Sequence, residues 1–316
     1  MSDFRWSYAV NQWKNTEIDF IRREQIESAF KTMSSVGFRA AEITDMAIGG
    51  RGMMSAFYGS PQGFLEFARN CGVDCVSSFL SGIGSADAFG GGAATDRGDH
   101  DRILESAKEL AGFIAEVGGS ALVAKPMGPY WKEAPVTKDK VAIAADCWNA
   151  AGKATRALGV KTALHLDFFG SLHDLNEIET FLALTDPKSV GLTLDTAELT
   201  IAGIDPVAFY EKYHDRIWHM HFKDAVVRDT TGEYKKPGAE LDYWPAAMVL
   251  AGLEQGIERW YYEMGTPGGL VDFPALVKAM KRFGYDGWIV AESDQSPHTE
   301  ESVLLNGWYR KFVLKS

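Results

Sequence analysis

Short apolar runs alternate with segments of helical spacing along the whole 316-residue sequence. The apolar runs have the length and composition of strands, and they end at Trp13, Ile43, Leu80, Lys125, Asp167, Asp195, Phe222 and Glu292. Between them, apolar residues recur every three or four positions in the segments 26–36, 61–72, 103–117, 141–158, 175–184, 206–213, 273–283 and 300–314. Such alternation requires parallel strands, and eight repeats in one chain fit a closed barrel better than an open doubly wound sheet. We therefore predict an α/β fold in which residues 1–316 form a single (β/α)8 TIM barrel.

The repeat is interrupted after the seventh strand candidate by an insertion at about residues 224–270. This segment has a helix candidate at 245–253, and it either covers the site or forms a subunit interface. Four aromatic residues would suit an interface: Trp244, Trp260, Tyr261 and Tyr262. Because the alternation resumes directly afterwards, we interpret the segment as an insertion and not as a new domain. A Rossmann-like sheet is the alternative to a barrel, but no GxGxxG motif follows the first strand candidate.

Charge and hydropathy limit the classes of partner. The net charge is −11, and no cluster of Lys and Arg is present, which argues against a nucleic-acid partner. No apolar stretch reaches the roughly 18 to 20 residues that a membrane span needs, and the N-terminal residues lack the apolar core of a signal peptide. We therefore expect a soluble, cytoplasmic protein without a membrane partner.

Four potential metal ligands stand at the ends of consecutive strand candidates: His165, Asp195, His221 and Glu292. In a parallel barrel these ends meet at one face, which is where functional groups gather. Any one of these residues alone would more often belong to a buried polar network, whereas four at matching positions favour a divalent cation. Two imidazoles and two carboxylates suit Mn²⁺, Co²⁺, Fe²⁺ or Zn²⁺ better than Ca²⁺. Asp167 points to the same strand face as His165, so the choice of fifth-strand ligand stays open between them.

Further polar residues lie near the same strand ends. Glu42, Lys125 and Lys223 are candidates for holding a substrate or moving protons, although each lysine has acidic neighbours with which it would simply pair. His219 shares a strand face with His221. Glu198 follows Asp195 closely, and a structural cap or ion pair is the expected role for it.

Several segments resemble a known family. Gly191–Thr196, Arg216–Asp224 and Gly284–Asp294 are similar to the sixth-, seventh- and eighth-strand motifs of the xylose-isomerase-like TIM barrels, the sugar phosphate isomerase/epimerase superfamily. The resemblance runs through most of the chain and is strongest after residue 160. Three features, His165 at the fifth strand, the turn Gly265–Phe273 and the segment Tyr285–Asp294, are most similar to the inosose dehydratase branch. Related barrels cleave 3-keto-glycosides.

The resemblance implies a divalent metal, Mn²⁺ first, with Co²⁺, Mg²⁺, Fe²⁺ or Zn²⁺ as alternatives. Carried over by position, it implicates Asp195, His221 and Glu292 as ligands. Sugar epimerases of the family commonly have Glu at the fifth strand, where this chain has His165, and His where it has Glu198. These departures favour elimination over epimerisation. The implied substrate is a keto-sugar, an inosose or a keto-glycoside, and the implied protein is a homo-oligomer or one part of a hetero-oligomer.

The chemistry that these substrates share is removal of a proton next to a carbonyl group, through a metal-stabilised enolate. The candidate catalytic residues are His219, Asp167 and Glu42 as the base and Lys223 as a cation beside the developing oxyanion. Loss of a β-substituent would make the protein a carbon-oxygen lyase. Returning the proton would make it a sugar isomerase or epimerase, which is the alternative. A metal-dependent endonuclease and a non-catalytic sugar-binding subunit are further hypotheses, and the acidic charge opposes the endonuclease.

Overall fold

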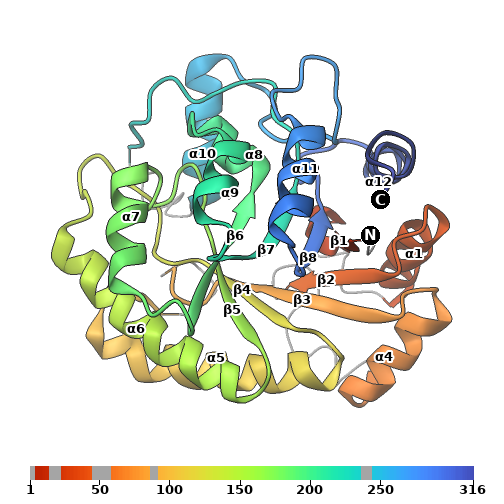
Figure 1. Cartoon of the computed structure of the whole chain (residues 1–316), viewed down its shortest axis with the longest axis horizontal. Helices are drawn as coiled ribbons and strands as arrows, with labels where there is room; N and C mark the ends of the chain where they lie inside the picture. Colours follow the sequence, from red (N-terminus) through yellow and green to blue (C-terminus); the bar gives the residue numbers. More distant parts are fainter. Residues whose placement is uncertain (1–3, 14–22, 45–57, 86–91, 236–243) are drawn as a thin grey trace.

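Eight parallel strands form the centre of the molecule, which a computed structural model describes for residues 4–13, 23–44, 58–85, 92–235 and 244–316. The strands close into a barrel in chain order, and the last pairs with the first (Figure 1). They are β1 (Arg5–Ala9), β2 (Ala40–Thr44), β3 (Cys75–Ser81), β4 (Ala121–Ala124), β5 (Lys161–His165), β6 (Val190–Asp195), β7 (Ile217–Phe222) and β8 (Trp288–Ala291). The predicted (β/α)8 TIM barrel is confirmed.

Helices follow the strands and flank the barrel (Figure 1). They are η1 (Val10–Trp13), α1 (Arg23–Ser35), α4 (Pro61–Asn70), η3 (Arg97–Asp99), α5 (His100–Glu116), α6 (Lys138–Ala157), α7 (Leu175–Leu184), α8 (Thr196–Ile201), α9 (Pro206–Tyr213), α10 (Trp244–Gln255), α11 (Phe273–Phe283), α12 (Thr299–Trp308) and η5 (Tyr309–Leu314). Local signals set their ends. At α11, Asp272 accepts a hydrogen bond from the Ala275 N–H (2.9 Å), a proline lies in the first turn, and Gly284 ends the helix at φ 68°. Within the described ranges, no helix has both the length and the apolar character to cross a membrane.

Two strands end at least two residues before the predicted position, whereas the other six end at it or one residue away. β1 stops at Ala9, and the chain turns into η1, where the Asn11 side chain donates a hydrogen bond to Glu292. β5 ends at His165, so Asp167 follows the strand instead of ending it. In both places the chain leaves the barrel wall to bring a polar side chain toward neighbouring strands.

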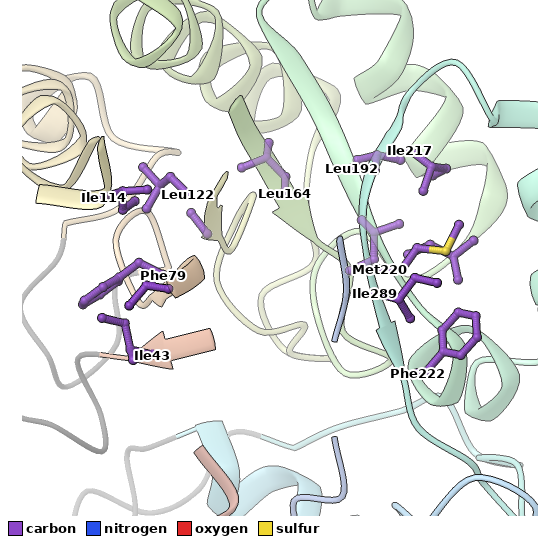
Figure 2. Close-up of a cluster of buried hydrophobic side chains, with 14 of the residues drawn as sticks. Ile43, Phe79, Ile114, Leu122, Leu164, Leu192, Ile217, Met220, Phe222 and Ile289 are labelled. Atoms are coloured by element: carbon purple, nitrogen blue, oxygen red, sulfur yellow. The ribbon is translucent and has the colours of Figure 1, made fainter. Parts of the chain in front are cut away.

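Side chains alternate across the barrel wall. In β7, Met220 and Phe222 belong to the apolar core, whereas His219 and His221 contact Glu42 of β2 across the barrel interior. Figure 2 shows part of that core, including Ile43, Phe79, Leu122, Leu164, Leu192, Met220, Phe222 and Ile289. The two-residue period of the strands thus separates an apolar layer under the helices from a polar barrel interior.

The insertion between β7 and α11 packs on the loops that follow the strands. Its backbone pairs with the end of β7, since the N–H and C=O groups of Asp224 and Tyr262 exchange two hydrogen bonds of 2.8 Å. Trp260 and Tyr261 are buried in a second apolar cluster with Phe168, which follows β5. The expectation that these two aromatic residues serve an interface is therefore wrong, because they are used inside the molecule. Tyr262 is only half-buried, and the side chain of Trp244 lies outside the described residues.

Candidate metal centre

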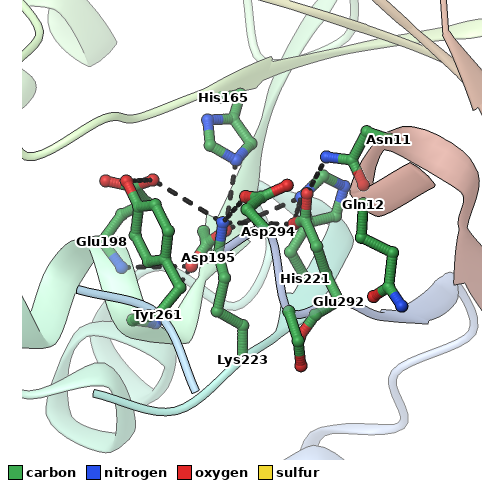
Figure 3. A network of polar contacts seen from close by, with 12 residues as sticks. Asn11, Gln12, His165, Asp195, Glu198, His221, Lys223, Tyr261, Glu292 and Asp294 are labelled. Carbon is green, nitrogen blue, oxygen red and sulfur yellow. Dashed lines mark hydrogen bonds and ion pairs between the residues drawn. The ribbon is translucent and has the colours of Figure 1, made fainter. Parts of the chain in front are cut away.

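The four predicted ligands lie together at the carboxyl end of the barrel (Figure 3). His165 and Asp195 end β5 and β6, His221 is the second-last residue of β7, and Glu292 directly follows β8. Ligand atoms of His165, Asp195 and His221 all lie within 4.8 Å of one another, and His221 Nδ1 is 3.0 Å from Glu292 Oε2. All four side chains are buried. The structure thus brings together the residues that the strand ends predict to meet.

Asp195 is held in place by the short helix α8. Its Oδ1 atom accepts hydrogen bonds from the N–H groups of Ala197 (2.9 Å) and Glu198 (3.0 Å), so the residue caps this helix. The other oxygen, Oδ2, faces the site and lies 3.3 Å from His165 Nε2. The sequence prediction missed α8. Because Asp195 Oδ1 caps this helix, only Oδ2 is left to face the site.

The imidazole of each predicted histidine ligand has a carboxylate on its far side. His165 turns Nε2 toward Asp195, while its Nδ1 lies 3.2 Å from Asp167 Oδ1. His221 turns Nδ1 toward the other ligands, while its Nε2 lies 2.9 Å from Glu42 Oε1. Outer carboxylates of this kind fix the orientation and tautomer of a metal-binding histidine. Burial alone would lower the pKa of His221, but the surrounding carboxylates, Glu42 first, outweigh it and raise the pKa well above its ordinary value.

Glu42 and His219 form a layer below the four predicted ligands, since His219 precedes His221 by two positions in β7. Glu42 Oε2 lies 3.0 Å from His219 Nε2 and accepts a hydrogen bond from the Ser78 hydroxyl (2.7 Å). Burial alone would raise the pKa of Glu42, but His221 and His219 outweigh it and lower the pKa. Burial lowers the pKa of His219 and favours its neutral form. Glu42 and His219 keep only 1% and 0% of their surface exposed, so neither is open to a substrate in this conformation.

Lys125 and Asp167 form a buried ion pair on the other side of His165. Both line a cavity of about 10 Å³, whose walls include Met127 and Phe169. This volume holds roughly one water molecule. Burial alone would raise the pKa of Asp167, but Lys125 and then His165 lower it to about 2, so the carboxylate stays ionised. Among the predicted bases, Asp167 is the one that lines this cavity.

Lys223 directs its ammonium group into the carboxylates of the site. The Nζ atom lies 3.0 Å from Asp195 Oδ2, 3.2 Å from Glu292 Oε2 and 2.9 Å from Asp294 Oδ2. The residue is only 2% exposed. Burial alone would lower the pKa of Lys223, but Asp195 and the other carboxylates outweigh it and raise the pKa well above its ordinary value.

Glu198 links α8 to the insertion. It accepts hydrogen bonds from the Phe168 N–H (2.9 Å) and from the Tyr261 hydroxyl (2.7 Å). Burial raises the pKa of Glu198 to about 7, although the nearby Lys223 opposes this shift. These contacts agree with the structural role expected for Glu198.

Three residues of the network were absent from the sequence prediction. Asn11 donates to Glu292, Asp294 pairs with Lys223, and the Tyr261 ring centre lies 4.0 Å from the Lys223 Nζ. Asn11 lies two positions before the end of the first strand candidate and Asp294 two positions beyond Glu292, so the rule that strand ends carry the site would have found both. No periodic signal marks Tyr261, because it comes from the insertion.

The site offers the donor set that a divalent cation requires. His221 Nδ1 is buried and has no hydrogen-bond partner, and Glu292 Oε2, 3.0 Å from it, has only the Lys223 ammonium group nearby, at 3.2 Å. Buried polar atoms are costly to leave unpaired, and a cation between them would satisfy both. Two imidazoles with two carboxylates suit Mn²⁺, Co²⁺, Fe²⁺ or Zn²⁺. The residues therefore fit a metal of this class.

Comparison with known proteins points to one family. The family described as xylose isomerase-like TIM barrel matches residues 30–311. An inosose dehydratase of Geobacillus kaustophilus is 26% identical over 313 residues, which cover 94% of this chain and 89% of that protein. An inosose dehydratase of Lacticaseibacillus casei is 33% identical over 147 residues, 46% of this chain, and the match spans only 44% of that relative.

The fold is similar to that of solved structures. A crystal structure of the IolI protein with a zinc atom has a TM-score of 0.68 and 14% identity, over 99% of this chain and 98% of that one. At this identity the likeness concerns the arrangement of strands and helices.

Proposed function

The chain belongs to the xylose isomerase-like TIM barrel family, and we propose that it is a divalent-metal-dependent enzyme acting on a keto-sugar or keto-polyol. The observation that carries this proposal is the convergence of His165 Nε2, Asp195 Oδ2 and His221 Nδ1, with Glu292 beside them, in a buried site. The relatives named inosose dehydratase support a sugar-modifying enzyme and favour a carbon-oxygen lyase, inosose-dehydratase-like or 3-keto-glycoside-cleaving.

We assign the four residues at the strand ends as the residues that would hold the ion. His165 is preferred to Asp167 because its Nε2 faces Asp195, whereas Asp167 lies on the far side of the ring. Mn²⁺ is the first candidate, and the zinc of the IolI protein supports a divalent ion in this fold. When bound, such an ion supplies positive charge that stabilises the enolate oxygen of a ketone substrate.

The residues around the cavity suit an elimination. Asp167 would take the proton from the carbon next to the carbonyl group, and that electron pair would become the new C=C bond as the C–O bond on the neighbouring carbon breaks. Lys125, which pairs with Asp167, would give a proton to the leaving hydroxyl, so that it departs as water. The product would be an unsaturated ketone.

The remaining candidates act around this pair. Lys223, whose ammonium group also contacts Asp294 and Glu198, is the candidate cation that would stabilise the developing oxyanion. Glu42 and His219 are buried behind His221, and we assign them as positioning residues that orient its imidazole.

The test combines metal analysis with a substrate screen. The protein would be purified without added metal, analysed for bound ions, stripped with a chelator and reloaded with Mn²⁺, Co²⁺ or Zn²⁺. Keto-inositols, ketoses and 3-keto-glycosides would then be incubated with it in D₂O and followed by NMR. We expect metal-dependent loss of water or aglycone. Asp167→Asn should lower kcat by roughly 10²- to 10⁴-fold, whereas the control Asp286→Asn, at an exposed carboxylate, should leave it unchanged.

Other outcomes separate the alternatives. Deuterium at the carbon next to the carbonyl group, without loss of water or aglycone, would identify a sugar isomerase or epimerase of the same superfamily. Failure to bind any of the three metals would reject the proposal.

A further inference from the structure

Lys223 places a positive charge where the metal site has its negative charges. Its Nζ atom is 3.0 Å from Asp195 Oδ2 and 3.2 Å from Glu292 Oε2. The same two oxygen atoms face His165 and His221, so they are the ones that a metal would use. In this structure the ammonium group neutralises two of the four proposed ligands.

The ammonium group and a metal cannot share these oxygens without strong repulsion. A metal ion bonds carboxylate oxygens at about 2.0 to 2.2 Å, so it would lie close to an ammonium group that stays in contact with both. Two cations at such a distance in a buried site repel each other by far more than thermal energy. Binding of the metal therefore requires the ammonium group to retreat.

Other partners for the ammonium group already lie beside it. Asp294 Oδ2 lies 2.9 Å from Nζ, Glu198 Oε1 lies 3.7 Å away, and the Tyr261 ring centre is at 4.0 Å. None of these three residues belongs to the proposed ligand set. A carboxylate and an aromatic face can hold a lysine ammonium group together.

The backbone of Lys223 is fixed, so the movement is confined to its side chain. Its N–H donates to the Thr196 hydroxyl (3.0 Å), and its carbonyl oxygen accepts a hydrogen bond from the same hydroxyl (2.6 Å). The flexible methylene chain of lysine allows a shift of the charged end without movement of the barrel.

We propose that Lys223 is an exchangeable internal cation, which holds Asp195 and Glu292 in the metal-free protein and moves toward Asp294 and Glu198 when a metal binds. This inference rests on the proposed metal site. Its consequence is that metal affinity is set partly by the competing ammonium group, and that the metal-free protein keeps a preformed ligand set.

The test measures binding of Mn²⁺ by calorimetry and of Co²⁺ by its visible absorption, without an activity assay. Lys223→Met should bind both ions at least about tenfold more tightly than the native protein, because the competitor is gone. Its metal-free form should unfold at a lower temperature, and metal should raise that temperature more than in the native protein. Asp294→Asn should weaken binding several-fold, because the displaced ammonium group loses its acceptor.

The double variant Lys223→Met/Asp294→Asn distinguishes movement of the Lys223 side chain from a direct electrostatic effect of Asp294 on the metal. If Lys223 moves toward Asp294, the effect of Asp294→Asn should disappear once the lysine is absent. If the two substitutions have additive effects on the free energy of metal binding, the proposed movement of Lys223 is overturned. Unchanged or weaker metal binding by Lys223→Met would overturn it as well. Asp294→Asn retains Lys223, so unchanged or tighter binding in this variant alone overturns the inference even if Lys223→Met fails to fold. Loss of metal binding in every form, native included, would reject the metal site itself.

Discussion

Substituting Glu42 by Gln separates a positioning role from a catalytic one. Glu42 contacts His221 Nε2 at 2.9 Å and His219 Nε2 at 3.0 Å, and it accepts a hydrogen bond from Ser78. The amide of Gln has nearly the same shape but lacks the charge, and it places an NH₂ group against one of its present partners. We therefore expect the His221 ring to be less well oriented and less basic.

The magnitude follows from the place of Glu42 behind a ligand. Loss of such an outer carboxylate typically weakens metal binding by about 10- to 100-fold, which corresponds to about 1.4 to 2.7 kcal/mol. Glu42 is 1% exposed, so water cannot take over its contact with the imidazole. We expect a loss in this range for Glu42→Gln.

The assay measures metal affinity and kcat separately. Metal is titrated by calorimetry, and turnover is then measured at saturating metal with the substrate found in the screen. We expect kcat within about threefold of the native value, because Glu42 positions a ligand and transfers no proton. Ser78→Ala is the matched control, since it removes one hydrogen bond to Glu42 and leaves the charge. A fall of kcat by a factor of about 100 or more at saturating metal, with unchanged affinity, would refute the positioning role and identify Glu42 as the base.

Three further predictions concern stability and the ligand set. Burial raises the pKa of Glu198 from its ordinary 4.5 to about 7 in the folded protein, so the stability it contributes is present below about pH 4.5 and is lost as the pH rises through 7. The free energy of unfolding in urea, compared between Glu198→Gln and the native protein, should therefore differ by an amount that changes by about 3 kcal/mol over this pH range. A difference that does not depend on pH would contradict this prediction. Gly152→Ala should destabilise the protein by about 1 to 3 kcal/mol in thermal unfolding, because the new Cβ would lie 2.1 Å from the Ser189 carbonyl oxygen. In the same measurement the control Gly112→Ala, whose Cβ would have no atom within 4 Å, should be neutral or stabilising. Asp195→Asn should lose metal binding but keep the cap of α8, whereas Asp195→Ala should lose both and cost about 1 kcal/mol more; equal stability of the two variants would argue against the cap.

The barrel, and the strand ends that carry the proposed ligands, were predictable because they depend on short-range periodicity. The alternation of β7 places His219 and His221 on one face and Met220 and Phe222 on the other, and this is visible in the sequence. Helices with clear signals were also found at their observed bounds, as with Leu175–Leu184, Pro206–Tyr213 and Phe273–Phe283. Parallel topology then brings the strand ends together without further information.

Contacts made by loops were not predictable in the same way. Tyr261 reaches Glu198 from the insertion, where the chain has no repeating pattern to say which side chain points inward. The distinction between ligand and outer carboxylate was equally hidden, because strand position places Glu42 and His221 on the same interior without showing which atoms meet. Such distinctions depend on side-chain rotamers and on pairings between distant segments.

Closure of the barrel by β8 has a kinetic consequence. Glu292 receives its hydrogen bond from Asn11, 281 residues earlier, and β8 pairs directly with β1. Contacts between such distant positions form late, because closing a long loop costs entropy before any pairing repays it. The complete set of proposed ligands should therefore form only in the last step of folding. The rate at which a refolding chain takes up metal would then report the rate of barrel closure.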